Sequence, residues 1–335
     1  MNRRLFLMSI AGAAGCSRID RPRLNVFNWS SYVAPDTIPN FEKEFGVRVR
    51  YAVYESNEEM LARVFSGNSG WDVVFPTHYF VKPMREQGLL APLRREWLPR
   101  LSALDPRFQA PVWDPDLKWC APFMWSGTGI AFNRKLSPPP ASWAALWEAR
   151  LGGRMTMLDD PAEVLGAALK KLGRSVNSAS PDELRAAARQ AVAQKPLLRA
   201  YLNAEVRDQL VAGDVLAAQL WATTAQQAMD ASKDLDFVYP AEGFPLYADT
   251  AVVLRESRRT ELAHRFINYL LRPEVSASIS RSTRTAACVP LPAELRNNPT
   301  LYPPPEVMRR GEWWETPPAA LQRLRDRLWT EIKSA

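Results

Sequence analysis

Two patterns of hydrophobic positions, one typical of strands and one of helices, alternate along the N-terminal third of the chain. Residues 47–53 (VRVRYAV) place an apolar side chain at almost every second position, which is typical of a strand with one buried face. In residues 36–45, Ile38, Phe41 and Phe45 fall three and four positions apart, on one face of a helix. The same signals predict strands at 24–27 and 71–75 and helices at 56–67 and 80–87.

Capping signals mark where several helices begin. Ser56 and Glu59 form a capping box, in which the two side chains bond to backbone N–H groups of the first turn. Similar signals open helices at Asp160 and Ser180. Further apolar runs predict strands at 213–221, 235–239 and 250–254 and helices at 261–271 and 317–332. The alternation of strands and helices predicts the α/β class, with helices packed on a mostly parallel sheet.

The first fifteen residues differ from the rest and predict an export signal. Arg3 and Arg4 supply a positive start, and residues 5–14 (LFLMSIAGAA) are uncharged and mostly apolar. Ten residues are too few to cross a bilayer, which takes about 20 helical residues. We therefore expect residues 1–15 to be a cleaved signal peptide.

Residues 13–16 (AAGC) resemble a bacterial lipobox, which implies cleavage before Cys16 and a lipid on its sulfur. Residues 16–22 would then be a lipid-anchored linker, and the protein a periplasmic lipoprotein held to the membrane through that lipid alone. Residues 2–7 (NRRLFL) also resemble a twin-arginine signal, so the export route stays open. The alternative is an ordinary secretory signal in which Cys16 is incidental.

Charge and length narrow the class of protein. Removing residues 1–15 leaves about 320 residues, enough for two lobes with sizeable cores. It also leaves 41 basic and 36 acidic residues, a net charge of +5. The basic residues are scattered among acids rather than gathered with aromatics, which argues against a nucleic-acid partner.

No residue pattern indicates catalysis. His78 and His264 lie far apart and in no metal-ligand spacing, and the sequence contains no GxSxG, phosphate-cradling glycine loop or CxxC. We therefore expect no catalytic residue, no metal and no cofactor. Cys120 and Cys288 could form one disulfide, but two buried thiols are the favoured interpretation.

Aromatic and acidic residues gather where predicted strands end. Ligands of open α/β sheets bind outside the carboxyl ends of the strands. An organic cation suits this set, because aromatic faces bind ammonium groups and carboxylates accept charge-assisted hydrogen bonds. The set contains three acids, five aromatics and no basic residue: Trp29, Tyr32, Thr77, Tyr79, Asp160, Glu163, Trp221, Tyr247 and Asp249.

Each of these residues also has a plainer interpretation. Asp160 and Glu163 fit the N-cap and third position of a helix, and for these two residues alone capping is the favoured role. Trp29 and Trp221 could be core residues, and Asp249 could belong to a turn. The group as a whole favours a binding site.

At these residues the chain resembles the periplasmic spermidine/putrescine-binding proteins of the extracellular solute-binding family. The resemblance extends over almost the whole mature length. It rests on residues 25–32 (NVFNWSSY), 54–58 (YESNE), 71–77 (WDVVFPT), 158–164 (LDDPAEV), 213–221, 239–243 (YPAEG), 266–273 (FINYLLRP) and 311–313 (GEW).

The resemblance implies a type II periplasmic-binding-protein fold, in which two α/β lobes joined by a hinge enclose the ligand. Lobe 1 would comprise 23–127 with 248–285, and lobe 2 would comprise 128–247 with 286–335. It also implies a monomer that works with an ABC permease and ATPase. The family's aromatic box would fall on Trp29, Tyr32, Trp221 and Tyr247, its amine-binding acids on Asp160, Glu163 and Asp249, and smaller polar contacts on Ser30, Thr77 and Tyr79.

Three positions depart from the family pattern. Ser31 stands where an acid is usual, Thr285 falls near a usual tyrosine, and Trp314 stands where a glutamine can occur. A serine hydroxyl does not neutralise an ammonium group, so Glu55 is a candidate substitute at that end. The alternative is a protein of the same fold for another organic cation or small solute.

Overall fold

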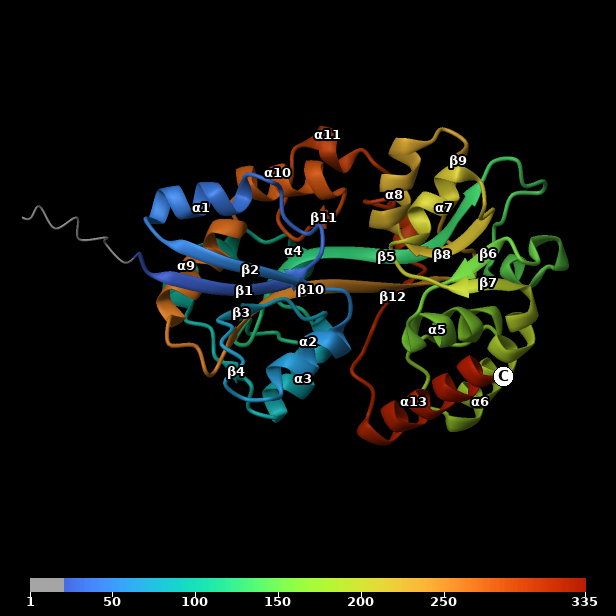
Figure 1. The fold of residues 1–335 in the computed structure, drawn as a ribbon, viewed down its shortest axis with the longest axis horizontal. Helices are drawn as coiled ribbons and strands as arrows, with labels where there is room; N and C mark the ends of the chain where they lie inside the picture. The colour runs from blue at the N-terminus through green and yellow to red at the C-terminus, as the bar shows by residue number, and fades with distance from the viewer. Residues whose placement is uncertain (1–20) are drawn as a thin grey trace, which may run out of the picture.

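The structure is a computed structural model that describes residues 21–335; Cys16 and the predicted export signal lie outside the described residues. Two lobes lie side by side, and two long strands run between them (Figure 1). The main path of the sheet has the order β2-β1-β3-β10-β5-β8-β6-β7. Within residues 21–335, the helices are too short or too polar to cross a membrane.

The first lobe follows the predicted strand–helix alternation. β1 (Arg23–Trp29) pairs in parallel with β2 (Arg48–Tyr54) and with β3 (Val73–Val74). The predicted elements of this region are confirmed, with ends displaced by a few residues. The connecting elements are α1 (Thr37–Phe45), α2 (Asn57–Val64), α3 (His78–Glu86) and β4 (Leu90–Ala91).

Two antiparallel strands join the lobes. β5 (Ala121–Asn133) is buried along its whole length and pairs with β10 (Phe244–Leu254). The sequence analysis missed β5 and predicted only the last five residues of β10. Both strands are covered on both faces, so they lack alternation, and Gly127, Gly129 and Pro245 resemble strand breakers.

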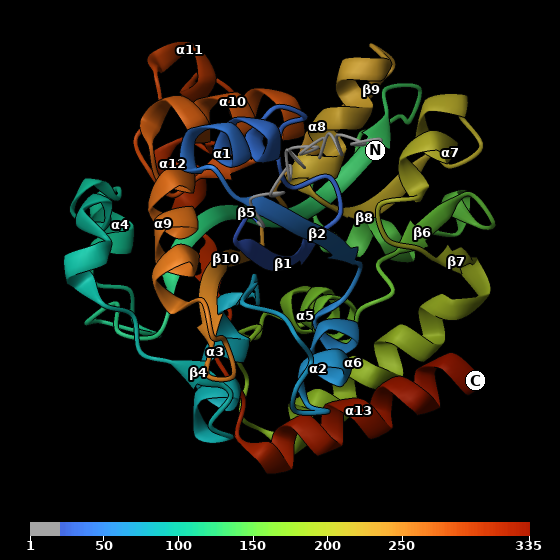
Figure 2. The ribbon, with the colours of Figure 1, turned by 60° about the vertical axis from the view of Figure 1, so that its left-hand side comes forward.

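The second lobe is built on the far half of β5. β8 (Ala217–Trp221) and β9 (Leu235–Val238) pair antiparallel with it, as predicted strands. β6 (Met155–Met157) and β7 (Leu198–Tyr201) complete the sheet and were not predicted. The helices here are α5 (Pro161–Lys171), α6 (Pro181–Gln194), α7 (Val206–Ala212), α8 (Ala222–Ala231) and α13 (Ala319–Ser334), which lies along α6 (Figures 1 and 2).

The remaining elements are shorter or pack around the first lobe. α9 (Thr260–Leu270) matches its prediction, and α10 (Pro273–Thr283) follows it directly. β11 (Ala286–Ala287) pairs with Met124 and Trp125 of β5. The others are α4 (Pro106–Gln109), α11 (Ala293–Arg296), α12 (Pro305–Met308), β12 (Gly311–Trp313) and the 3-10 turns 95–97, 99–103, 143–147, 149–151 and 195–197.

A buried histidine fixes a third passage of chain beside the two long strands. β12 pairs with the start of β10, and Trp314 follows it. His78 Nε2 donates to the carbonyl of Trp314 at 2.7 Å, while Nδ1 accepts from the backbone N–H of Ala248 at 3.1 Å. Burial lowers the pKa of His78 to about 4, so the ring is neutral and holds one tautomer.

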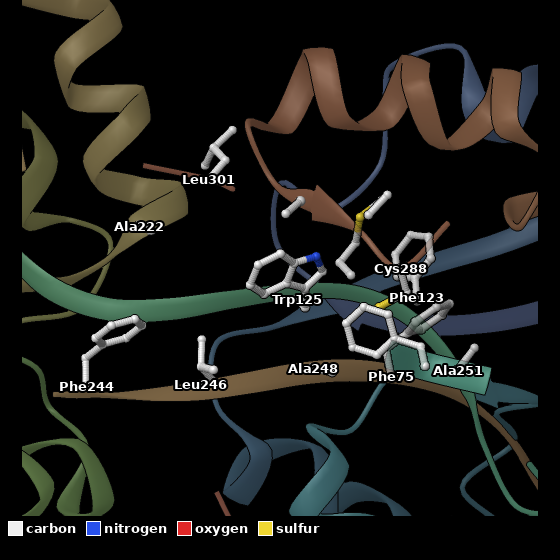
Figure 3. Packing of buried hydrophobic residues seen from close by; sticks show 14 of the residues in the cluster. Phe75, Phe123, Trp125, Ala222, Phe244, Leu246, Ala248, Ala251, Cys288 and Leu301 are labelled. Carbon is white, nitrogen blue, oxygen red and sulfur yellow. The ribbon is translucent and has the colours of Figure 1, made fainter. Parts of the chain in front are cut away.

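The core around the long strands also contains the two cysteines. Cys120 and Cys288 are both buried and free, so the favoured interpretation of two thiols is confirmed. Burial raises the pKa of each thiol. Cys288 lies with Phe75 and Phe123, whose ring centroids are 5.3 Å apart (Figure 3).

Close packing against β5 gives a first prediction. A Cβ built on Gly129 would lie 2.4 Å from the backbone oxygen of Val238, which cannot rotate away. Gly129→Ala should therefore lower the free energy of unfolding by about 1–3 kcal/mol, measured by urea denaturation. Gly127→Ala is the matched control, because its Cβ would meet only side-chain atoms, at 3.0 Å or more. Equal effects of the two changes would contradict this account.

Candidate functional site

A cavity of about 560 Å³ lies between the two lobes. All ten residues that the sequence analysis assigned to ligand binding line it, and they come from both lobes. The carboxyl ends of β1 and β8, the middle of β10 and the first turns of α3 and α5 therefore converge on one space. The ten are Trp29, Ser30, Tyr32, Thr77, Tyr79, Asp160, Glu163, Trp221, Tyr247 and Asp249.

Asp249 is the buried acid of the first lobe, with 2% of its surface exposed. Its carboxylate accepts from the Tyr32 hydroxyl at 2.5 Å and from the Thr77 hydroxyl at 2.8 Å. The strand register shifts immediately after Asp249, and such bulges commonly redirect a side chain beside a site. Burial raises its pKa to about 6, against the two hydrogen bonds.

Asp160 and Glu163 have different roles in the second lobe. Asp160 is the N-cap of α5, and its Oδ1 accepts from the backbone N–H groups of Ala162 and Glu163 at 2.8 and 3.0 Å. The plainer interpretation is therefore confirmed for Asp160. Glu163 does not complete a capping box, because its Oε1 accepts instead from the Thr128 hydroxyl of β5 at 3.0 Å.

The second oxygen of Glu163 is buried and makes no hydrogen bond of good geometry among the described residues, although the nearby indoles of Trp221 and Trp314 act to lower the pKa of Glu163. Burial and the neighbouring charge of Asp160 raise the pKa of Glu163 to about 8. Ionising a buried carboxyl group that has only one hydrogen-bond donor is costly in the empty protein. A cationic group entering the cavity would supply the missing donor and the missing charge.

Aromatic side chains form much of the remaining wall. Trp29 is fixed by a hydrogen bond from its Nε1 to the carbonyl of Phe75 at 2.8 Å. Tyr79 and Trp314 lie with ring centroids 6.4 Å apart. Burial, followed by the charge of Asp249, raises the pKa of Tyr247, so its hydroxyl stays protonated. The wall offers apolar ring faces between the acids of the two lobes.

The sequence analysis missed several lining residues, including a basic one. Arg207 lies at the exposed rim and pairs with Asp208 at 3.1 Å, although the predicted set contained no basic residue. Residues 203–207 follow β7, a strand that the pattern did not predict, and residues 223–227 lie on α8 just after Trp221. The missed residues are Asn57, Asn203, Ala204, Glu205, Arg207, Thr223, Thr224 and Gln227.

The three departures from the family pattern fall in different places. Ser31 lies exposed in the lining with a φ of 53°, and Ser30 beside it donates to Glu55 at 2.9 Å. Trp314 lies in the wall and packs on Gly166, where an added Cβ would meet the indole at 2.9 Å. Thr285 is buried, accepts from Thr283 at 3.1 Å and is absent from the lining.

Two α/β lobes joined by paired strands, with a polar and aromatic cavity between them, define a solute-binding protein. Residues 37–301 match the model of the bacterial extracellular solute-binding proteins. The chain belongs to this family.

Relatives that match nearly the full chain are also solute-binding proteins. A putrescine-binding periplasmic protein, PotF of Escherichia coli, is 32% identical and is matched over 97% of this chain and 95% of its own length. The spermidine/putrescine-binding periplasmic protein of the same organism is 32% identical over 90% of this chain and 89% of its own. The solved TpPotD lipoprotein of Treponema pallidum is 28% identical, with a TM-score of 0.83 over 92% and 99% of the two chains. The predicted two-lobed binding-protein fold is confirmed.

The pKa of Glu163 predicts a pH-dependent stability. The folded protein holds this proton up to about pH 8, whereas the unfolded chain releases it near its ordinary pKa of 4.5. The folded state thus binds more protons between these values, and the stability contributed by Glu163 falls as pH rises through this window. Glu163→Gln should remove that loss.

The measurement is the melting temperature of the ligand-free protein from pH 5 to pH 9. The melting temperature of Glu163→Gln should rise relative to that of the wild type as the pH increases. The corresponding difference in the free energy of unfolding should reach up to about a few kcal/mol. The exposed change Glu261→Gln is the control. A constant difference across this range would show that the Glu163 carboxyl is not desolvated.

Proposed function

We propose that this protein is the substrate-binding component of an ABC importer and that it binds a polyamine of the spermidine/putrescine kind. The observation that supports this most directly is the unpartnered, buried oxygen of Glu163 in a cavity that also holds the buried Asp249. Two desolvated carboxylates with aromatic rings between them suit ammonium groups joined by methylene stems. The polyamine-binding names of the relatives agree with this chemistry.

In this proposal the ligand is carried without chemical change, and closure of the lobes is driven by the ligand. An ammonium group bound by the acids of one lobe attracts the acids of the opposite lobe, which favours closure. β5, β10 and the segment at Trp314 form the hinge. The lobe limits of 23–127 with 248–285, and 128–247 with 286–335, remain a prediction. β11, which pairs with β5 beside lobe 1, indicates that the last boundary lies after residue 287.

The site of action follows from the N-terminal signal and from the periplasmic relatives. We propose export to the periplasm, anchoring through an acyl group on Cys16, and delivery of the ligand by a monomer to the permease and ATPase subunits. The lipid anchor keeps the protein near its permease without a spanning helix.

Asp249 tests the ligand assignment. An ammonium group that loses its carboxylate in a buried site loses about 2–5 kcal/mol, so Asp249→Asn should weaken putrescine or spermidine binding at least about 30-fold. Titration calorimetry measures this, with the exposed change Asp182→Asn as the control. Wild-type affinity in the Asp249→Asn variant would overturn the assignment of this site.

The anchor has its own test. Bacteria that express the wild type in the presence of labelled palmitate should incorporate the label into the protein, and Cys16→Ser should abolish it. Equal labelling of the two proteins, or none in either, would remove the lipoprotein proposal and leave the binding proposal intact.

A further inference from the structure

We propose that the cavity selects a diamine, with two ammonium groups separated by four or five methylene groups, and that the buried guanidinium of Arg325 disfavours a third ammonium. This inference rests on the proposed function and goes beyond it, because the polyamine-binding relatives include both putrescine-binding and spermidine/putrescine-binding proteins. It follows from the number of buried charges, their spacing and the surroundings of Arg325.

The first argument is the number of desolvated acceptors. Of the five acids in the lining, only Glu163 and Asp249 are buried. Asp160 keeps part of its surface exposed and spends one oxygen on capping α5, although burial also raises its pKa, and the remaining acids, Glu55 and Glu205, are exposed. Exposed carboxylates remain hydrated and screened, so they bind an ammonium group weakly.

The second argument is the spacing along the long strands. Leu246 pairs with Gly127, so continuing that register by one residue sets Thr128, which holds Glu163, opposite Pro245, four residues before Asp249. Four residues of antiparallel strand separate the two Cα atoms by about 13–14 Å. An extended 1,4-diaminobutane measures about 6 Å between its nitrogens at the spacing of an extended chain. With a charge-assisted hydrogen bond of about 2.8 Å at each end, it spans about 12 Å.

Spermidine does not fit this spacing with both end nitrogens paired. Its nine bonds between end nitrogens measure about 10–11 Å when extended, and the two hydrogen bonds bring the span to about 16 Å. One ammonium group must therefore extend past Glu163 or past Asp249. On the side of Asp249 lie Tyr32, the exposed Ser31 and the exposed Glu55, which accepts from the Ser30 hydroxyl at 2.9 Å.

The aromatic wall agrees with this two-ended arrangement. Burial, then the charges of Asp160, Glu58, Glu163 and Asp249, raise the pKa of Tyr79, and burial, then Asp249 and Glu163, raise that of Tyr247. Both rings are therefore close enough to sense both carboxylates. A chain of methylene groups between two ammonium groups would lie against these rings.

On the second lobe the obstacle is the charge of Arg325 of α13, which lies near Trp314 of the cavity wall and is not itself part of the lining. This side chain is 95% buried, with 5% of its surface exposed. Its Nη2 donates to the carbonyl of Val176 at 3.2 Å, and its Nε is buried without a partner among the described residues. The guanidinium lies 5.8 Å from the centroid of the Trp314 ring, which forms part of the cavity wall.

The charge of Arg325 interacts with the acids of the second lobe, Asp160 and Glu163. Burial lowers the pKa of Arg325, while Tyr79 and Asp160 raise it, so the guanidinium and Asp160 sense each other. With Asp160 and Glu163 ionised, the two negative charges and this positive charge leave a net charge of −1 at that end. Asp249 supplies −1 at the other end, so these four groups together neutralise two ammonium groups, while the other charged residues of the lining, Glu55, Glu205 and Arg207, are exposed.

The test compares dissociation constants for 1,4-diaminobutane, 1,5-diaminopentane and spermidine by titration calorimetry at one ionic strength. The wild type should bind a diamine at least about tenfold more tightly than spermidine. Arg325→Gln should shift the ratio of the two constants at least about tenfold toward spermidine. Arg323→Gln is the control, because it removes the same charge from an exposed position of the same helix.

Ser31→Asp tests the other end without disturbing the core. Ser31 is exposed with a φ of 53°, a conformation that Asp tolerates better than most residues. The new acid should tighten spermidine binding about tenfold and change diamine binding less. This variant decides the question even where circular dichroism shows that Arg325→Gln does not fold.

The outcomes separate the proposals. Wild-type binding of spermidine that is as tight as that of either diamine would overturn diamine selection. An unchanged ratio in folded Arg325→Gln would remove Arg325 from the explanation, since a merely structural role would weaken both ligands alike. No binding of any of the three amines would instead overturn the polyamine function itself.

Discussion

The pairing of β5 with β10 is the constraint on which the rest of the structure depends. These strands carry the sheets of both lobes, and their buried positions admit little change, as Gly129 illustrates. One face of the pair also carries Tyr247, Asp249 and Thr128, which orients Glu163. The pair of strands that joins the lobes therefore also forms the floor of the site. A ligand held there contacts side chains whose positions depend on both lobes.

The buried acids of the site are poorly supported without a cation. Asp249 is supported by two hydroxyl donors, whereas Glu163 has one, and its second oxygen has no partner among the described residues. Burial raises the pKa of both acids, which means that the empty cavity opposes their ionisation. Ionising these buried acids costs free energy in the empty protein. A cationic ligand lowers that cost, and the difference contributes to the free energy of binding.

Local signals were reliable where an element showed a clear apolar period or, as in the buried β1, a short apolar run. β1, β2, α1 and α9 followed their patterns, and the strand-end rule supplied nine of the ten predicted lining residues, with Ser30 added by the family resemblance. The same reasoning failed for β5, β6 and β7, which are short or covered on both faces and show no alternation. Because β7 was missed, the rim residues 203–207, including Arg207, were missed as well.

The sequence by itself determined the α/β class, most of the elements and the kind of chemistry, because apolar period, caps and residue type are local properties. Only the tertiary structure decided that Asp160 caps α5 while Glu163 turns to Thr128, since the two roles share one sequence signature. It alone brought Arg325, on the last helix, to the wall beside Trp314. Desolvation and charge proximity arise from contacts between distant segments, which a linear pattern does not contain.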